Sequence, residues 1–284
     1  MTIAPHATVL IDRLGSGPLF VHSDLFRTAR LVNQTRNRSE FLNAHTNLLL
    51  EIAKDRGLWM PAFNYDFPQT HIFNLASDPV QLGPLPQHFR TNNANWRTSA
   101  PIFSASGTGV EPFIPWGDNI DPFGKNSLFA HLIADDGVVL YYGDTFNCST
   151  IIYFAEGLVG GGVYRYKKLF GGRVVYPDGE SVGGSLSCLV RPFGKDLDYN
   201  WSRLQDAAVA AGICVRLPEF PVLLAASARH LSELFTTKLM ADPLSLLDHE
   251  SRVWVEPMLA TLGRRFLMVL LRALQFSIKN MNFR

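Results

Sequence analysis

Two short segments place polar side chains directly beside apolar or aromatic runs. His22, Ser23 and Asp24 follow the apolar run 18–21, so they form a turn whose amide groups can meet a ligand. Asp66 lies within the aromatic segment 63–67, where its carboxylate can bind a substrate amine while neighbouring rings stack on a sugar or a base. The structural alternatives are a capped turn at 22–24 and a surface aspartate beside core aromatics.

The segment 164–168 alternates aromatic and basic residues. On a strand, successive side chains point to opposite faces, so Arg165 and Lys167 would share one face, and Tyr164, Tyr166 and Lys168 the other. Cations in this arrangement suit a phosphate, on a coenzyme or on a nucleotide-linked sugar. The structural alternative is a strand half-buried by its tyrosines, with the cations in water.

Hydrophobic periodicity predicts the elements that position these residues. In the first quarter, the apolar run 18–21, a helix from Ser39 to Arg56 and a buried strand over 58–63 form a strand–helix–strand unit. A short helix over 127–133, a strand over 138–142 and a helix over 150–158 follow. Between these groups, the stretch 64–124 is rich in turns and aromatics, and irregular stretches of this length are usually functional.

The later part of the chain predicts an antiparallel insert and helices. Residues 163–192 indicate hairpins, with turns at Gly171-Gly172 and at 177–179. Helices are expected over 204–211 and 225–240, and one or two more over 253–276. We therefore expect one α/β domain over residues 1–284, with a central mixed sheet, flanking helices, an antiparallel hairpin insert and a helical C-terminal extension over 215–284.

Composition excludes several classes of partner. The 284 residues are 47% hydrophobic and carry a formal net charge of +1, so no concentrated basic face suggests nucleic acid. Three scattered cysteines, Cys148, Cys188 and Cys214, show no metal-ligand spacing, and reduced thiols favour a cytoplasmic protein without a metal. The apolar stretch 266–276 contains Arg272 and is too short to span a membrane, which takes roughly 20 residues. The longer apolar tail 258–276 is either a core helix or the contact surface of a homodimer.

Seven segments, in order, resemble a known enzyme family. They lie at 20–25, 60–67, 83–90, 97–104, 122–127, 147–156 and 164–166, and include a His-Ser-Asp-Leu turn, a Pro-Ala-Phe-Asn-Tyr segment, an Arg-Thr-Ser-Ala-Pro run and a Phe-Gly-Lys-Asn-Ser turn. Together they resemble the aminoglycoside 3-N-acetyltransferase family, and the last segment resembles members associated with sugar biosynthesis. The last hundred residues carry no resemblance.

The resemblance implies a fold distinct from the common GNAT acetyltransferases and an attack of a sugar amine on an acyl-coenzyme A thioester. It implies coenzyme contacts at the first turn, at two positions of the Arg-Thr-Ser-Ala-Pro segment and near the thioester, namely Ser23, Asp24, Leu25, Arg97, Ser104 and Thr150. It implies acceptor contacts on the aromatic segment and the later motifs, namely Phe63, Tyr65, Asn147, Glu156 and Arg165. The structural alternatives are that Arg97 bonds loop carbonyls, Ser104 caps a turn, Asn147 caps a helix and Glu156 is a solvated helix residue.

Two histidine positions of the family pattern are not occupied by histidine. They are Ala100, which cannot titrate, and Tyr153, whose type titrates near 10. Three accounts follow: the amine reacts without a protein base, or His22, His71 or Asp66 supplies one, or the chain has moved to other chemistry. General-base help contributes about 10²- to 10⁴-fold, so the first account is chemically sound.

Three functions therefore compete. The first is N-acylation of an amino sugar, free or nucleotide-linked, or of another small biosynthetic amine, rather than of a polycationic antibiotic, since the irregular stretch holds no dense acidic cluster. The second is a divergent relative that binds a related ligand or runs another reaction. The third is an unrelated hydrolase with Cys148 as nucleophile, whose thiol pKa a helix N-terminus would lower.

Overall fold

This computed structural model describes residues 3–192 and 195–263. Its strands are β1 (Leu19–Ser23), β2 (Leu58–Pro61), β3 (Ile72–Asn74), β4 (Trp96–Arg97), β5 (Ala105–Gly107), β6 (Val138–Tyr142), β7 (Tyr166–Val175), β8 (Ser181–Val190), β9 (Cys214–Arg216) and β10 (Leu223–Ser227). Its α-helices are α1 (Ile3–Asp12), α2 (Leu25–Thr28), α3 (Arg38–Ala53), α4 (Phe67–Thr70), α5 (Pro84–Asn92), α6 (Leu128–Ala134), α7 (Ile151–Leu158), α8 (Trp201–Ala210), α9 (Ala228–Ala241) and α10 (His249–Leu262).

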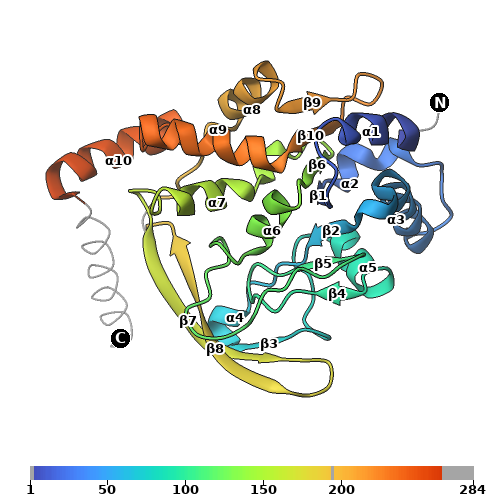
Figure 1. Ribbon diagram of the computed structural model, residues 1–284, viewed down its shortest axis with the longest axis horizontal. Coiled ribbons are helices and arrows are strands. Elements are labelled where there is room, and N and C mark those ends of the chain that lie inside the picture. Colours follow the sequence, from blue (N-terminus) through green and yellow to red (C-terminus); the bar gives the residue numbers. More distant parts are fainter. Residues whose placement is uncertain (1–2, 193–194, 264–284) are drawn as a thin grey trace, which may run out of the picture.

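The strands form a seven-stranded mixed sheet and a three-stranded sheet (Figure 1). The order is β4-β5-β2-β1-β6-β10-β9 in the large sheet and β3-β7-β8 in the small one. At the centre of the large sheet, β1 pairs in parallel with both β2 and β6, with His22 opposite Tyr141. The carboxyl ends of these three strands therefore meet at one edge, where open α/β sheets bind ligands. The α/β class, the central mixed sheet and the first strand–helix–strand unit are confirmed.

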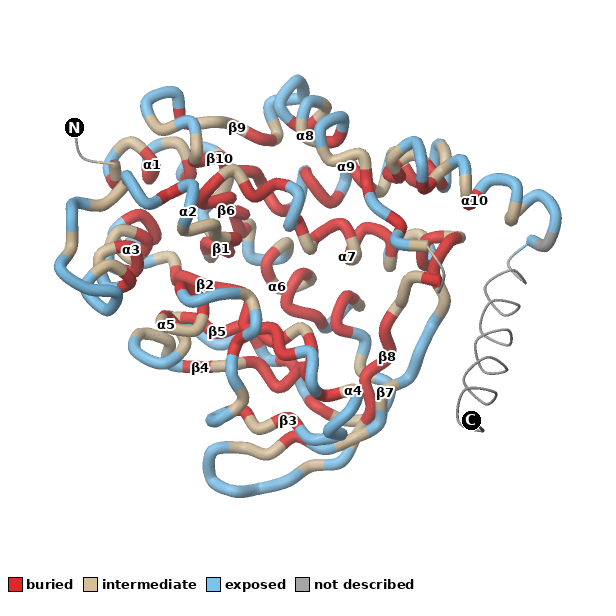
Figure 2. The backbone as a smooth tube through the Cα atoms, turned by 180° about the vertical axis from the view of Figure 1, so that it is seen from behind, coloured by how far each residue is buried: buried red, intermediate tan, exposed pale blue. Residues whose placement is uncertain are grey.

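Helices cover both faces of the large sheet, so its central strands are buried throughout (Figure 2). Alternate residues of β1 supply the two cores: Phe20 packs on one side with α6, α7 and α9, and Val21 on the other with α1, α3 and α5. A third core lies under the small sheet, around Phe67 and Phe73. Full burial explains why β1 and β6 have continuous apolar runs rather than alternating ones.

The structure corrects the predicted start of α3. Asn37, not Ser39, caps the helix, because its side-chain oxygen accepts from the Glu40 amide at 3.0 Å. The Glu40 carboxylate accepts in return from the Arg36 amide at 2.9 Å, which completes a reciprocal cap.

The insert is a single long hairpin rather than two. The strand β7 runs straight through Gly171 and Gly172, and the chain reverses only at 176–180. Gly172 is needed for close packing instead: a Cβ there would lie 2.5 Å from the His71 carbonyl oxygen and 2.7 Å from the Phe67 ring. Gly172 therefore marks a close approach of β7 to the segment around α4, not a turn.

Residues 215–284 are not purely helical. Residues 225–227, predicted as the start of a helix over 225–240, instead belong to the fully buried strand β10, which joins β9 in the large sheet before α9 begins. No helix among residues 3–192 and 195–263 combines the length and apolar character needed to cross a bilayer. Most of the predicted self-association surface at 258–276 lies outside the described residues.

Candidate active site

The carboxyl ends of β1, β2 and β6 open onto a cavity of about 400 Å³, here called the His22 cavity. It is lined by His22, Phe63, Tyr65, Leu82, Phe103, Phe123, Asn147, Cys148, Ser149, Thr150, Tyr153, Arg165, Leu189 and Trp201. Six residues predicted from the sequence as site residues are thus brought together, although they span more than 140 positions: His22, Phe63, Tyr65, Asn147, Thr150 and Arg165.

A second cavity of about 400 Å³ adjoins the first and is called the Ser23 cavity. It is lined by residues 23–27, 82, 84–86, 143–145 and 147–148, so the predicted Ser23, Asp24 and Leu25 all face it. Leu82, Asn147 and Cys148 line both cavities. A long ligand in the Ser23 cavity can therefore reach a second molecule in the His22 cavity.

The turn at the end of β1 is held against the end of β6. The Asp24 amide donates to the Tyr142 carbonyl at 2.8 Å, and the Asp24 carboxylate caps α2 by accepting from the Phe26 amide at 2.8 Å. Gly143 adopts a φ of +113°, and a Cβ there would lie 2.7 Å from the Asp24 carbonyl oxygen. Only glycine lets the two strand ends approach this closely.

His22 lies in the wall of its cavity and is almost completely buried. Its ring stacks on Tyr141, and its Nε2 lies 3.4 Å from the Thr150 hydroxyl. Burial lowers the pKa of His22 to about 3, so the imidazole is neutral at physiological pH. A neutral ring can accept a hydrogen bond, but a cation at this position is strongly disfavoured.

A buried ionic cluster lies behind the cavity wall at Arg165. Glu156, on α7, is 0% exposed; its carboxylate accepts from the Tyr164 hydroxyl at 2.6 Å and the Tyr199 hydroxyl at 2.7 Å, and pairs with Arg165 Nε at 2.6 Å. The Arg165 guanidinium also donates to the Tyr199 hydroxyl and lies 4.9 Å from the centre of the Tyr153 ring. Burial alone would lower the pKa of Arg165, but Tyr199, Glu156 and Tyr153 outweigh it and raise the pKa. Glu156 is thus no solvated helix residue.

Comparison with known sequences identifies the family of the chain. A sequence profile described as aminoglycoside 3-N-acetyltransferase matches residues 40–207, well over half of the chain. The chain belongs to the aminoglycoside 3-N-acetyltransferase family. Enzymes of this family transfer an acetyl group from acetyl-coenzyme A, so the chain is by family an acyl-coenzyme A-dependent N-acyltransferase.

Solved structures share the fold of this acetyltransferase. Aminoglycoside acetyltransferase AAC(3)-Xa is 18% identical at a TM-score of 0.64, over 86% of this chain and 93% of its own. AAC-IIIb in a binary complex with CoASH is 15% identical at 0.62, over 83% and 95%. A variant of AAC(3)-IVa in complex with apramycin is 18% identical at 0.60, over 85% and 93%. No curated protein sequence matches the chain.

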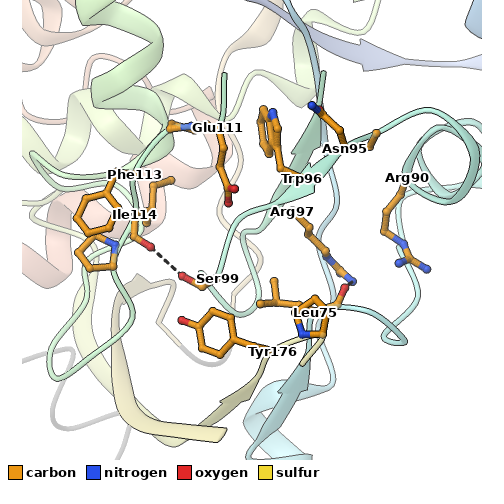
Figure 3. Close-up of a pocket in the computed structure, with 14 residues that line it drawn as sticks. Leu75, Arg90, Asn95, Trp96, Arg97, Ser99, Glu111, Phe113, Ile114 and Tyr176 are labelled. Atoms are coloured by element: carbon orange, nitrogen blue, oxygen red, sulfur yellow. Dashed lines mark hydrogen bonds between the residues drawn. The ribbon is translucent and has the colours of Figure 1, made fainter. Parts of the chain in front are cut away.

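Five predicted site residues of the acetyltransferase do not line the His22 or Ser23 cavity: Glu156, described above, and Arg97, Ser104, Asp66 and His71. Arg97 lies in a separate cavity of about 580 Å³ beneath Trp96, with Arg90, Glu111 and Tyr176 (Figure 3). Its guanidinium donates to the carbonyls of residues 62, 75 and 78 and to the buried Ser104 hydroxyl, which is the structural alternative expected for Arg97.

The remaining two are the base candidates Asp66 and His71. Both are exposed, and neither is among the residues that line the His22 cavity. His71 takes up a left-handed conformation at the end of α4, and its Nδ1 contacts the Gly171 carbonyl at 2.8 Å. Of the three candidate bases, only His22 therefore faces the cavity.

The two positions without histidine have different surroundings in this acetyltransferase. Ala100 is buried in the core that α6, α7 and α9 form against the sheet. Tyr153 lines the His22 cavity, where its ring lies between Phe123 and Arg165. The phenol therefore contributes an aromatic wall at the point where the family pattern has a histidine.

Sequence reasoning missed the aromatic lining contributed by distant loops. Phe103, Phe123 and Trp201 line the cavity, and Tyr199 holds the ionic cluster behind it. The first two lie in the irregular stretch singled out as functional, but no periodicity marks them. Trp201 and Tyr199 follow the hairpin insert, and only the tertiary fold brings them to the site.

Cys148 does not suit the hydrolase hypothesis. Burial and the nearby Asp24 carboxylate raise the pKa of its thiol, contrary to the lowering that a helix N-terminus was expected to cause. The thiol therefore stays protonated at neutral pH and is a poor nucleophile. It is nevertheless accessible at the junction of the two cavities, whereas Cys188 and Cys214 are buried.

We expect N-ethylmaleimide to modify Cys148 selectively and to abolish coenzyme A binding, because the adduct would fill the junction of the cavities. Acetyl-coenzyme A, which has no free thiol to react with the reagent, should at ten times its Kd slow the modification roughly tenfold by mass action. Mass spectrometry of the labelled protein and calorimetric titration with coenzyme A measure the two effects. Unprotected labelling would contradict the placement of the coenzyme, and a Cys148→Ala variant that stays active would exclude a cysteine nucleophile.

Proposed function

We propose that this acetyltransferase acylates the amine of an amino sugar, free or nucleotide-linked, or of a similar small biosynthetic amine. The observation that carries the proposal is the pair of adjacent cavities that share Leu82, Asn147 and Cys148 as lining residues. One is lined by the turn at the end of β1 and suits the coenzyme, and the other is lined by aromatic rings and suits a sugar ring. Acyl-coenzyme A as donor fits the cytoplasmic location expected from the sequence.

The coenzyme would lie in the Ser23 cavity. The turn 23–25 supplies backbone donors there, and Arg27, at the same cavity, has a half-exposed guanidinium 3.7 Å from Asp24 and 3.6 Å from Asp144. Such a cation can exchange a weak surface ion pair for a coenzyme phosphate. The pantetheine arm would then pass Asn147 and Cys148, and the thioester would meet Thr150 in the His22 cavity.

The acylation itself needs a neutral amine. The amine nitrogen attacks the thioester carbon, the C–N bond forms as the C–S bond breaks, and the departing thiolate takes up a proton from the ammonium. His22 would accept a hydrogen bond at the site, because forming its cation at pH 7 costs roughly 5 kcal/mol at a pKa near 3. The amine therefore enters the reaction deprotonated, and aromatic walls that exclude water favour that form.

An antibiotic acceptor has weaker support. Aminoglycosides are polycations, and a site for them needs carboxylates. Among the described residues that line the His22 cavity there is no aspartate or glutamate. Glu156, behind the wall, is fully buried and engaged by Arg165 and two tyrosines. An acceptor with a single amine suits this cavity better.

The direct test combines coenzyme binding with thiol release. We expect coenzyme A to bind at micromolar concentrations in calorimetric titration, and amino sugars to release free thiol from acetyl-coenzyme A. Release with an aminoglycoside but with no amino sugar would overturn the proposed acceptor. Binding without release from any amine would instead favour the divergent relative. An absence of coenzyme binding would overturn the acyltransferase function.

A further inference from the structure

We propose that the acceptor carries an oxyanion, a carboxylate or a phosphate, beside its amine, and that Arg165 binds this group inside the His22 cavity. The inference rests on the proposed function, since it specifies the acceptor of that same site. Glu156 and Tyr199 act as positioning residues, because they hold the guanidinium without lining the cavity themselves.

The charge of the cavity supports an anionic ligand. Arg165 carries the only formal charge among the described lining residues at neutral pH, because burial keeps His22 neutral and raises the pKa values of Tyr65 and Cys148. The Arg165 side chain is only 5% exposed, so water screens its charge little, and the anion would share this cation with Glu156. A second cation on the ligand near this point would be repelled.

The guanidinium has donors to spare. Of its five N–H groups, one on Nη2 donates to Tyr199 and one on Nη1 makes a long contact of 3.5 Å with the Leu189 carbonyl. Nε lies 2.6 Å from Glu156 Oε2 as an ion pair but makes no hydrogen bond with any described residue. The remaining N–H on each terminal nitrogen has no acceptor among the described residues. The side chain is only 5% exposed, yet Arg165 is among the residues that line the cavity, so a ligand there lies beside a guanidinium with N–H groups left to donate.

Stability does not account for the ion pair. Burying two charges costs hydration free energy, and their mutual attraction barely offsets that cost. Proteins in which apolar residues of similar volume replace such a pair are often equally stable. Arg165 lines the cavity wall beside Tyr153, whose ring centre lies 4.9 Å from the guanidinium, and Glu156 pairs with Arg165 from behind this wall. Recognition of an oxyanion requires a cation that is held in place before the ligand binds. Here Glu156 holds Arg165 and balances its charge from behind the cavity wall.

The experiment compares matched acceptors on the protein saturated with coenzyme A. Glucosamine is titrated against glucosamine 6-phosphate, 2-amino-2-deoxyglucuronic acid and uridine diphosphate glucosamine at constant ionic strength. We expect at least one anionic compound to bind about tenfold more tightly than glucosamine, since charge-assisted hydrogen bonds of this type support that ratio. Comparing 2-amino-2-deoxyglucuronic acid with the two phosphate compounds shows whether the site prefers a carboxylate or a phosphate. No preference over glucosamine in any arm would overturn the inference.

Three variants assign the preference to Arg165. In the charge-balanced double variant Glu156→Gln with Arg165→Gln, the preference should disappear while coenzyme A still binds, because the proposed contacts of its phosphates lie at residues 23–27 in the Ser23 cavity. Tyr199→Phe should reduce affinity for the anionic compound and leave glucosamine unchanged. Arg173→Gln, an exposed arginine of the same hairpin, should retain the full preference. A preference that survives in the double variant would refute the role of Arg165.

Failure of this inference and failure of the proposed function give different results. If glucosamine and its anionic counterparts release thiol from acetyl-coenzyme A equally well, the acyltransferase function is supported and the oxyanion site is refuted. If anionic acceptors bind more tightly but no amine releases thiol, the site for the oxyanion stands and the reaction does not.

Discussion

Replacing Glu156 by glutamine should lower the free energy of unfolding by about 3 kcal/mol, because it leaves the buried guanidinium of Arg165 without its counter-charge. Glutamine keeps the shape of the side chain and can still accept from the Tyr164 and Tyr199 hydroxyls, which contact one carboxylate oxygen at 2.6 and 2.7 Å. The loss therefore reports the charge rather than the packing. Urea denaturation followed by circular dichroism measures it.

A double-mutant cycle provides the control for this prediction. Arg165→Met in the Glu156→Gln background removes the stranded cation, so most of the lost stability should return. Glu180→Gln, at the exposed tip of the hairpin, should change the free energy of unfolding by less than about 0.5 kcal/mol. A loss below about 1 kcal/mol for Glu156→Gln would show that the ion pair is solvated or exchanges its partners.

Acidification from pH 6 to pH 5 should lower the free energy of unfolding by about 2 kcal/mol through two buried histidines. Burial lowers the pKa of His22 to about 3 and of His45 to about 4, whereas in the unfolded chain both titrate near 6.5. Below pH 6.5 the unfolded chain therefore binds more protons than the folded one, and each such proton costs stability at about 1.4 kcal/mol per pH unit. The stability is fully present above pH 6.5 and is lost as the pH falls towards 4.

Histidine variants separate the two contributions. His45 packs within the core with its Nδ1 2.5 Å from the Tyr142 hydroxyl, so His45→Asn tests a histidine remote from the cavities. Each of His22→Asn and His45→Asn should remove about half of the pH dependence, and the pair together most of it. His249→Asn, at an exposed position, should leave it unchanged. Urea denaturation at pH 5, 6 and 7 measures the free energy of unfolding of each variant. If this free energy falls equally steeply with acidification in all variants, groups other than these histidines cause the acid sensitivity.

Local patterns were sufficient for the elements that carry the site. Strand β6 was predicted with its observed ends, and the helix at 150–158 matches α7, because both are continuous apolar segments with a turn or a cap beside them. The turn at 22–24 follows its strand as expected. By contrast, residues 225–227 of β10 were taken for helix, since a short fully buried strand has no periodicity to separate it from an apolar helix.

Side-chain roles depended on where the chain brings distant partners. The alternation at 164–168 placed Arg165 and Lys167 on one strand face, but β7 begins only at Tyr166, so Arg165 turns inward to Glu156 while Lys167 stays in water. Arg97 donates to the carbonyls of Leu75 and Asp78, about 20 residues away in sequence, which is the structural alternative and could not be read from its own segment.

The sequence by itself determined the fold class, the family resemblance and the cluster of residues at the end of β1, because these follow from short-range patterns and ordered motifs. The tertiary structure alone decided which of those residues share a cavity, and that Tyr199 and Glu156, 43 residues apart, hold one arginine between them. It also decided that His22 is neutral. The physical reason is common to all three: burial and charge pairing arise from contacts between distant segments, and no local pattern encodes how much water a side chain retains.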